Sequence, residues 1–421
     1  MALINQQILV LKILHIATHA GFGGAGNAAI RIFDSQKNRG IDVDFLSLTN
    51  RLNHPGVNIY EPETVIDRLK LAKSFLDNSN GVNIYKDHIE DDKSSEIVNK
   101  INKSNADIVN LHWVNGMLTI RDIGKITKPL VWTLHDMWAF CGEEHISQDV
   151  RWREGYTPSN RLPSESGPDI NLISWKYKVE SWTSNMNLIA PSDWLRDCAR
   201  QSALMRNWHS ITIPHPIDTL AWLPLDQKKA RNSLGYKASD RIIVFGAANG
   251  VADPIKGFDL LIKALDHLQP EFGNIQLLVF GKKNISPQTK SRIQINYLGE
   301  INDDYKLREV YSAADLVAAP SRIESFCQIA AEAIACGTPV VAFDNSGIAE
   351  VVKHKHNGYL AEAFDPKDFA SGIHWILSLS PTNLNNLKMK SREYCVDTLN
   401  YQKISSKYIA LYKDIYSKLS L

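Results

Sequence analysis

APSRIESFCQIAAEAIACGTPVVAFDNSGIAEVV, residues 319–352, places a helical pattern between two short apolar runs at 315–321 and 338–343. Runs of this kind predict parallel strands that are buried on both faces. Glu324 follows the first run, at the strand end where open α/β sheets bind ligands. Glu332 falls about two turns into the helix among apolar neighbours, where a carboxylate is costly unless it meets donors such as ribose hydroxyls.

The backbone amides of Ser325, Phe326 and Cys327 are expected to open this helix and can hold a phosphate there. Capping or surface charge would explain either glutamate alone. Neither capping nor surface charge explains why two glutamates and a helix start occur together. We therefore expect a ligand site for a phosphate and a sugar in this half of the chain.

The same alternation of apolar runs and helical patterns covers most of the 421 residues. The predicted strands form two series: 8–17, 43–48, 107–113, 129–135 and 187–192, then 241–247, 275–281, 315–321 and 338–343. Two such series predict an α/β protein with two Rossmann-like, doubly wound domains. The hinge is expected at 212–227, which holds three prolines. Residues 401–421 predict an amphipathic helix packed on a domain surface.

Composition excludes several classes of protein. A net charge of +1 gives no reason to expect nucleic acid as a partner. Five scattered cysteines predict reduced thiols in a cytosolic protein. The apolar start at 8–17 is interrupted by Lys12 and favours a strand over a signal peptide, and no run reaches the roughly 18 apolar residues of a membrane span.

Residues 19–29, HAGFGGAGNAA, contain the G-x-G-x-x-G pattern of dinucleotide-binding loops. An NAD site needs an acid at the carboxyl end of the next strand, whereas Asp42 and Asp44 stand at its start. NAD is therefore disfavoured, and the loop amides can instead hold an anion or approach a sugar closely. A tight turn without a ligand is the alternative. The D-x-D of Asp42 and Asp44 is explained as a polar strand start that needs no metal.

These motifs carry a resemblance. The two glutamates eight positions apart, in the frame PS…ESF…EA…GTPVVA followed by SGIAEVV and NGYL, resemble the retaining glycosyltransferases of family 4. The resemblance extends to IKGFDLLIKAL, YLGEINDDYKLREVYSAADLVAAPS, PHPIDTLAWLP and GGAGNAAIRI, at 255–265, 297–321, 214–224 and 23–32. The segment WTLHDMWAFCGEEH resembles enzymes of colanic-acid, capsule and O-antigen assembly.

The resemblance implies the GT-B fold, with two Rossmann-like domains facing across a cleft. The acceptor-side domain would span 1–215 and receive the C-terminal helix 400–421, and the donor-side domain would span 216–399. It implies a metal-independent hexosyltransferase that uses a UDP- or GDP-linked sugar as co-substrate and no cofactor. The acceptor would be a saccharide or a lipid-linked saccharide in cell-surface polysaccharide or lipopolysaccharide synthesis. The protein would be cytoplasmic, with peripheral contact at the inner face of the membrane.

The resemblance also implies roles for particular residues. Catalytic roles fall to Glu324, which would contact the donor-sugar hydroxyls, and to His135, near the reacting sugar. Lys256 would bind the donor diphosphate and Glu332 the ribose. The donor site would further include Ser325, Phe326, Cys327 and Gly246, and the phosphate and acceptor loop would include Gly23, Gly24 and Ala25.

The chain departs from the family pattern at several positions. The segment before Lys256 reads FGAANGVADPIKG and lacks the arginine that the family usually carries there; Asn249, Lys282 or Lys283 are candidate substitutes. Cys327 and Ser346 stand where the family usually has glycines. The missing arginine keeps a non-catalytic sugar-nucleotide-binding protein open as an alternative, beside an epimerase or a phosphorylase of the same fold. Residues 141–168 are expected to form a long polar loop that helps to select the acceptor.

Overall fold

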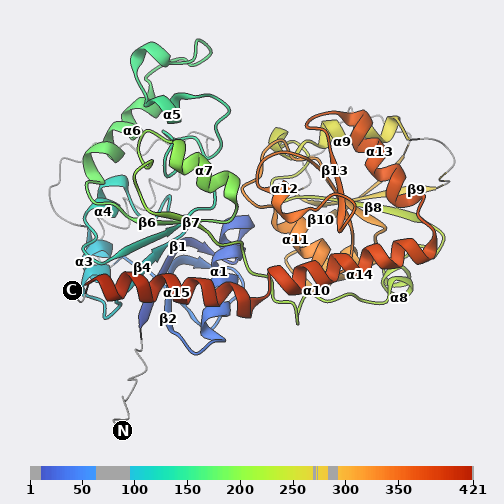
Figure 1. Cartoon of the computed structure of the whole chain (residues 1–421), viewed down its shortest axis with the longest axis horizontal. Coiled ribbons are helices and arrows are strands. Elements are labelled where there is room, and N and C mark those ends of the chain that lie inside the picture. The colour runs from blue at the N-terminus through green and yellow to red at the C-terminus, as the bar shows by residue number, and fades with distance from the viewer. Residues whose placement is uncertain (1–10, 63–94, 269–271, 273, 283–292, 420–421) are drawn as a thin grey trace, which may run out of the picture. The chain divides into compact units, whose positions relative to one another are not determined.

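The computed structural model describes residues 11–62, 95–268, 272, 274–282 and 293–419. The chain folds into two compact units, which are coloured along the chain in Figure 1. Unit 1 comprises Met1–Ile213 and Ser405–Leu421, and unit 2 comprises Pro214–Ile404. The chain passes from unit 1 to unit 2 inside the proline-containing segment at 212–227.

Unit 1 is built on a seven-stranded parallel sheet in the order β3-β2-β1-β4-β5-β6-β7. The strands are β1 Lys12–Ala20, β2 Asp42–Asn50, β3 Val57–Ile59, β4 Ile108–Leu111, β5 Leu130–Thr133, β6 Asn187–Ala190 and β7 Ser210–Thr212. The strand order reverses between β1 and β4, so the loops after these two strands border the crevice where doubly wound sheets bind ligands. Residues 8–10 of the first predicted strand lie outside the described residues.

The helices of unit 1 are α1 Gly23–Lys37, α3 Glu96–Lys103, α4 Ile120–Gly124, α5 Arg151–Glu154, α6 Ile170–Ser181 and α7 Asp193–Gln201, with the 3₁₀ turn η1 at Pro158–Asn160. Several begin at side chains that cap free amides. Thr119 and Asp122 form a capping box on α4, and Ser192 accepts from the amide of Leu195 on α7. The apolar faces of these elements enclose a core that includes Ile16, Val109 and Leu188.

Unit 2 is built on a six-stranded parallel sheet in the order β10-β9-β8-β11-β12-β13. The strands are β8 Arg241–Ala247, β9 Ile275–Gly281, β10 Gln294–Gly299, β11 Leu316–Ala319, β12 Val340–Phe343 and β13 Gly358–Ala361. The helices are α8 Gln227–Ser233, α9 Phe258–Asp266, α10 Asp304–Ala313, α11 Gln328–Ala335, α12 Ile348–Val351, α13 Pro366–Leu377 and α14 Pro381–Thr398, with the 3₁₀ turn η2 at Pro254–Lys256. Its strand order reverses between β8 and β11.

The last helix, α15 (Tyr401–Leu419), lies mainly in unit 1 and is the red helix that ends at the C-terminus in Figure 1. Its apolar residues recur at helical spacing and are buried: Ile404, Tyr408, Leu411, Tyr412 and Ile415. The Tyr412 hydroxyl accepts hydrogen bonds from the side-chain amides of Gln36 on α1, at 3.3 Å, and Asn110 on β4, at 2.8 Å. The predicted fold of two doubly wound parallel sheets, with the C-terminal helix returning to the first, is confirmed.

Within the part of the chain that the structure describes, every helix is too short or too polar to cross a lipid bilayer.

Candidate functional site

An ion pair between Lys256 and Glu324 lies where the strand order of unit 2 reverses. Lys256 ends η2, after β8, and Glu324 follows β11, the neighbouring strand. Lys256 Nζ donates to Glu324 Oε1 at 2.7 Å, and the Ser321 hydroxyl donates to the same oxygen at 2.8 Å. Burial lowers the pKa of Lys256, but the adjacent Glu324 carboxylate outweighs burial and leaves that pKa raised. The lysine is therefore a cation at any physiological pH.

The loops that carry these two side chains are locked together. Gly257 has a φ of +69°, and a Cβ on it would lie 2.0 Å from the Pro320 carbonyl oxygen, so only glycine fits. The Arg322 amide donates to the Ile255 carbonyl at 2.7 Å, and its guanidinium binds both carboxylate oxygens of Asp259 at 2.9 and 2.8 Å. The distance between Lys256 and Glu324 is thus set by the fold.

A third segment fixes the backbone of Glu324. Its amide donates to the Ser346 hydroxyl at 3.0 Å, and its carbonyl accepts from the Gly347 amide at 2.8 Å. Ser346 stands where the family usually has glycine and adopts a φ of +51°. Ser321 and Ser346 both lie in the motif that identifies Glu324, but the pattern of residues alone did not indicate that their hydroxyls contact this glutamate.

Glu332 is the fifth residue of α11 and is 5% exposed. The Tyr311 hydroxyl from α10 donates to its Oε2 at 3.0 Å. The Tyr311 hydroxyl therefore supplies one of the hydrogen bonds to the buried Glu332 carboxylate that we expected from ribose hydroxyls. The sequence held no signal for Tyr311, which lies in an ordinary helical pattern.

Helix α11 begins at Gln328, one residue later than we expected, so Ser325, Phe326 and Cys327 precede it. Cys327 is the N-cap residue, with φ 78° and ψ 84°. Burial and the nearby Glu324 raise the pKa of its thiol, which stays protonated. Phe326 is buried against His215 at a ring separation of 5.1 Å.

Gly246 lies in β8, where a Cβ would come within 2.2 Å of the Phe280 ring. Close packing against β9 therefore accounts for this glycine. The Lys282 amide donates to the Ala248 carbonyl at 3.3 Å, and Lys283 lies outside the described residues. Arg322 also reaches the loop before Lys256, where its guanidinium donates to the Pro254 carbonyl at 2.6 Å, but it is paired with Asp259.

The glycine loop of unit 1 joins β1 to α1, as expected. A Cβ on Gly21 or Gly26 would collide, with Leu52 at 2.4 Å and with the His19 carbonyl oxygen at 2.7 Å respectively. A Cβ on Gly24 would meet nothing within 4 Å, and its φ is not positive. Neither packing nor backbone conformation requires glycine at this position. Gly23 also faces open space but has a φ of +65°, and Ala25 follows in the first turn of α1.

His135 lies two residues beyond β5, and its Nε2 is 3.1 Å from Nδ1 of His112, which follows β4. Burial lowers the pKa of His135 to about 4, although Asp136 acts in the opposite direction. Asp136 pairs with His145 at 2.7 Å and accepts from the indole of Trp113 at 3.1 Å. His135 is therefore neutral near pH 7 and sits in a polar, aromatic surrounding. The sequence offered a signal for His112, which follows a strand end as His135 does, but we did not use it.

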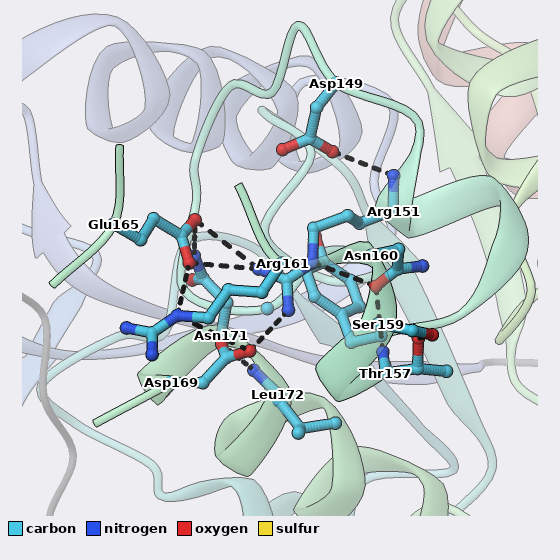
Figure 2. A network of polar contacts seen from close by, with 12 residues as sticks. Asp149, Arg151, Thr157, Ser159, Asn160, Arg161, Glu165, Asp169, Asn171 and Leu172 are labelled. Atoms are coloured by element: carbon cyan, nitrogen blue, oxygen red, sulfur yellow. Dashed lines mark hydrogen bonds and ion pairs between the residues drawn. The ribbon is translucent and has the colours of Figure 1, made fainter. Parts of the chain in front are cut away.

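Residues 141–168 form a long irregular segment, as we expected, interrupted by α5 and η1. Arg151, which is 1% exposed, pairs with Glu165 at 3.1 Å and Asp169 at 2.6 Å (Figure 2). The same network includes Asn160 and Arg161. Lys178, fully buried on α6, donates to the carbonyl oxygens of Trp138, Cys141 and Gly142. These contacts hold the segment after His135 in one conformation.

The D-x-D motif has a structural explanation. Asp44 pairs with Lys12 of β1 at 3.1 Å, and Asp42 lies 3.9 Å from the same ammonium group. Among the residues that the structure describes, no group of three or more histidine, cysteine, aspartate or glutamate side chains is placed to hold a metal ion.

Solved structures with the same architecture identify the fold. The crystal structure of HepE from Anabaena in complex with UDP-glucose is 18% identical, with a TM-score of 0.66 over 97% of this chain and 99% of that one. Sucrose-phosphate synthase from Thermosynechococcus elongatus is 19% identical, with a TM-score of 0.65 over 97% and 100%. WaaG, a glycosyltransferase involved in lipopolysaccharide biosynthesis, is 18% identical, with a TM-score of 0.61 over 94% and 98%. This chain has the GT-B fold.

Sequence comparison finds a family match in the second half of the chain. Residues 226–394, which include Lys256, Glu324 and Glu332, match the family Glycosyl transferases group 1. The D-inositol 3-phosphate glycosyltransferase of Mycolicibacterium vanbaalenii is 32% identical over 197 residues, 42% of this chain and 42% of that protein. The enzyme of that name from Segniliparus rotundus is 32% identical over 176 residues, 39% and 38% respectively. The chain thus matches about two fifths of the length of these curated relatives.

Proposed function

We propose that this chain is a retaining, metal-independent glycosyltransferase that moves a hexose from a UDP- or GDP-linked donor to a saccharide or lipid-linked saccharide. The observation that carries the proposal is the Lys256–Glu324–Ser321 cluster. It lies at the strand-order reversal of unit 2, inside the segment that matches Glycosyl transferases group 1. Crevices at such reversals are where doubly wound sheets bind nucleotides.

The chemistry of glycosyl transfer fits these side chains. The bond between the anomeric carbon and the diphosphate oxygen breaks, and the leaving diphosphate gains negative charge. Lys256, a half-buried cation, can stabilise that charge without a metal. Binding of the diphosphate would draw Lys256 away from Glu324, whose carboxylate would then accept hydrogen bonds from sugar hydroxyls. The acceptor oxygen would attack on the same face, and its proton would pass to the leaving phosphate.

Unit 1 would supply the acceptor side. A Cβ on Gly24 would meet nothing within 4 Å and no side chain caps α1, so the first amides of this helix would be available to an anionic or hydroxyl ligand. The neutral His135 would contact the reacting sugar. The lipopolysaccharide role of WaaG supports a cell-surface saccharide as product, whereas the D-inositol 3-phosphate glycosyltransferases support a phosphorylated polyol as the acceptor to test beside it. A lipid-linked acceptor would bring a cytoplasmic enzyme to the inner face of the membrane.

A non-catalytic sugar-nucleotide-binding protein is the second candidate. The family arginine before Lys256 is absent, and Arg322, which reaches the same loop, is paired with Asp259. The diphosphate would then be neutralised by fewer cations than in the family pattern, chiefly by Lys256. Such a protein would bind the donor without consuming it.

The deciding experiment is calorimetric titration of UDP, GDP, ADP and NAD into the protein with EDTA present, followed by donor-consumption assays with saccharide and inositol phosphate acceptors. Binding of one nucleoside diphosphate, but not NAD, is expected. Glu324→Gln should lower turnover by at least about 100-fold because a sugar-hydroxyl contact is lost in the transition state. Glu300→Gln, at an exposed glutamate after β10, is the matched control. Wild-type turnover in Glu324→Gln would remove Glu324 from the site, and binding without turnover would favour the second candidate.

A further inference from the structure

A chain of hydrogen-bonded side chains begins at His135 and runs through the interior of unit 1. His135 Nε2 lies 3.1 Å from His112 Nδ1, His112 Nε2 lies 2.9 Å from His15 Nδ1, and His15 Nε2 lies 3.1 Å from Gln36 Oε1. We call His135, His112, His15 and Gln36 the histidine relay. Its members come from four separate segments: the turn after β5, the end of β4, the middle of β1, and α1.

The far end of the histidine relay sets its direction. Gln36 Nε2 donates to the Tyr412 hydroxyl of α15 at 3.3 Å, so its Oε1 is the atom that faces His15. The Tyr412 hydroxyl also accepts from Asn110 Nδ2 at 2.8 Å. An amide oxygen only accepts, so the His15 nitrogen facing it, Nε2, must carry the proton.

The remaining protons follow one after another. His15 is 0% exposed, and burial lowers its pKa to about 4, so it carries one proton near pH 7 and its Nδ1 is an acceptor. His112 must then donate from Nε2 to that nitrogen. A second proton on His112, which is 1% exposed, would place a charge between two neutral rings, so its Nδ1 accepts from His135 Nε2. Every bond of the relay runs in the same direction, away from His135.

We propose that His112, His15 and Gln36 are positioning residues that hold His135 as the Nε2–H tautomer, so that its Nδ1 accepts a hydrogen bond from a hydroxyl of the reacting sugar. The sugar part of this proposal rests on the proposed function. The tautomer part rests on the hydrogen bonds and on the neutral state of the buried rings, and not on the proposed function. The packing of α15 through Tyr412 completes the arrangement because it orients the amide of Gln36.

The tautomers can be measured on the full chain without any substrate. Long-range ¹H–¹⁵N correlation spectra of ¹⁵N-histidine-labelled protein at pH 7.5 distinguish a protonated Nδ1 from an unprotonated one. His135, His112 and His15 are all expected to show protonated Nε2 and unprotonated Nδ1, with assignments made by single His→Asn variants. A protonated Nδ1 on His135 in the wild-type protein would overturn the proposal. This measurement is made on the wild-type protein, so it does not depend on whether a Gln36 variant folds.

Two variants on α1 test the dependence on Gln36. Gln36→Leu removes the terminal acceptor, so the relay loses its direction and His135 should gain protonation at Nδ1. Ser35→Ala is the matched control, since Ser35 is equally buried but its hydroxyl donates to the Ile32 carbonyl. Ser35→Ala should leave the His135 tautomer unchanged. An unchanged His135 signal in folded Gln36→Leu would contradict the positioning role.

Kinetics separate the two parts of the proposal. Gln36→Leu should lower kcat about ten-fold, the effect of one lost hydrogen bond in the transition state, and leave nucleoside diphosphate affinity unchanged. Absence of turnover in the wild-type protein would contradict the proposed function while leaving the tautomer result intact. Wild-type kcat in a Gln36→Leu variant with an altered tautomer would show that His135 Nδ1 contacts no reacting sugar.

Discussion

At the scale of single residues, two glycines in the first turn of α1, Gly24 and Gly26, have different surroundings. Gly26 has no room for a side chain, because a Cβ would lie 2.7 Å from the His19 carbonyl oxygen. Gly24, two residues earlier, faces open space with an ordinary φ. Packing explains the first glycine, and under the proposed function a ligand that approaches the backbone closely would explain the second.

This contrast predicts opposite outcomes for two alanine substitutions. Gly24→Ala should keep the free energy of unfolding within about 0.5 kcal/mol of wild type, because the new methyl group meets no protein atom. It should lower kcat/KM for the acceptor at least about ten-fold, because that methyl group displaces the substrate. Urea unfolding and initial-rate kinetics measure the two effects.

Gly26→Ala is the counterpart in the same helix. It should lose roughly 1–3 kcal/mol of stability, because the backbone of β1 or α1 must shift to admit the methyl group. Full activity in a stable Gly24→Ala variant would show that no ligand approaches this position.

Cys327 introduces backbone strain at a position where it replaces a glycine of the family pattern. It holds a φ of 78° where the family usually has glycine, in a backbone region that disfavours side chains by about 1–2 kcal/mol. The strain lies directly before α11, at the loop that carries Glu324. The surrounding contacts, among them those of Ser346 and Gly347 to Glu324, maintain the backbone despite it.

At the scale of elements, the segment between β5 and β6 is held by buried charges. Arg151 binds Glu165 and Asp169, and Asp169 also caps α6 by accepting from the Leu172 amide at 3.0 Å. One arginine thus connects α5, the turn near Glu165 and the start of α6, as Figure 2 shows. The segment that follows His135 is therefore ordered before any acceptor binds.

Arg151→Met should release this segment. Removing the buried cation leaves Glu165 and Asp169 with Arg161, at 3.4 and 4.0 Å, in place of their closer partner and should cost roughly 3 kcal/mol. Amide hydrogen exchange of residues 155–172 should speed up while β1 and β4 stay protected. Arg153→Met is the control, because Arg153 is an exposed arginine of the same helix that lies over the Trp152 ring. Equal exchange in the two variants would mean that the Arg151 network does not order the segment.

The interior strands of the two sheets could be predicted from the sequence, whereas the strands at the sheet edges could not. The nine predicted strands correspond to the nine interior strands of the two sheets, which are apolar on both faces. The four strands that we missed are the sheet edges β3, β7, β10 and β13. An edge strand pairs on one side only and is shorter or more polar, as in QINYLG of β10, so its apolar run is too weak to recognise.

The site divides in the same way. Lys256 and Glu324 each belong to a motif, so both could be predicted although 68 positions separate them. The histidine relay could not, because the bond that orients its end member Gln36 comes from Tyr412, 376 positions away, and neither residue belongs to a motif. Contacts of that range follow from the docking of α15, which a pattern of apolar residues predicts only as a helix with one buried face.

At the scale of the whole molecule, the buried histidines make unit 1 sensitive to acid. His15 has its pKa lowered by burial from 6.5 to about 4, so between these values the unfolded chain binds a proton that the folded chain does not. The stability contributed by the neutral ring is present above pH 6.5 and is lost as the pH falls toward 4. At about 1.36 kcal/mol per pKa unit, His15 alone accounts for roughly 3 kcal/mol. His135 has the same sign, because burial lowers its pKa to about 4 as well.

His145 acts in the opposite direction. Burial lowers its pKa, but Asp136 outweighs burial and leaves it raised, so its contribution is present at low pH and lost as the pH rises. The Asp136 pKa is lowered, because His145 outweighs the effect of burial, so this pair persists until the pH falls below the ordinary aspartate range. The pKa is lowered for three histidines, His15, His19 and His135, and raised for His145, so acidification from pH 6.5 to 4 gives a net loss of stability.

Urea unfolding followed by tryptophan fluorescence measures this loss in the right unit, because eight of the ten tryptophans lie before residue 214, in unit 1. The unfolding free energy of wild-type unit 1 should fall steadily between pH 6.5 and 4. His15→Asn should be less stable at pH 7 yet fall less steeply, because one buried imidazole that stays neutral in the folded state is gone. Parallel pH profiles for wild type and His15→Asn would mean that folding does not lower the pKa of His15, so that the folded chain also binds this proton between pH 6.5 and 4. A protonated His15 would donate from both nitrogens, and the one-directional arrangement of the histidine relay would then hold only above that pH range.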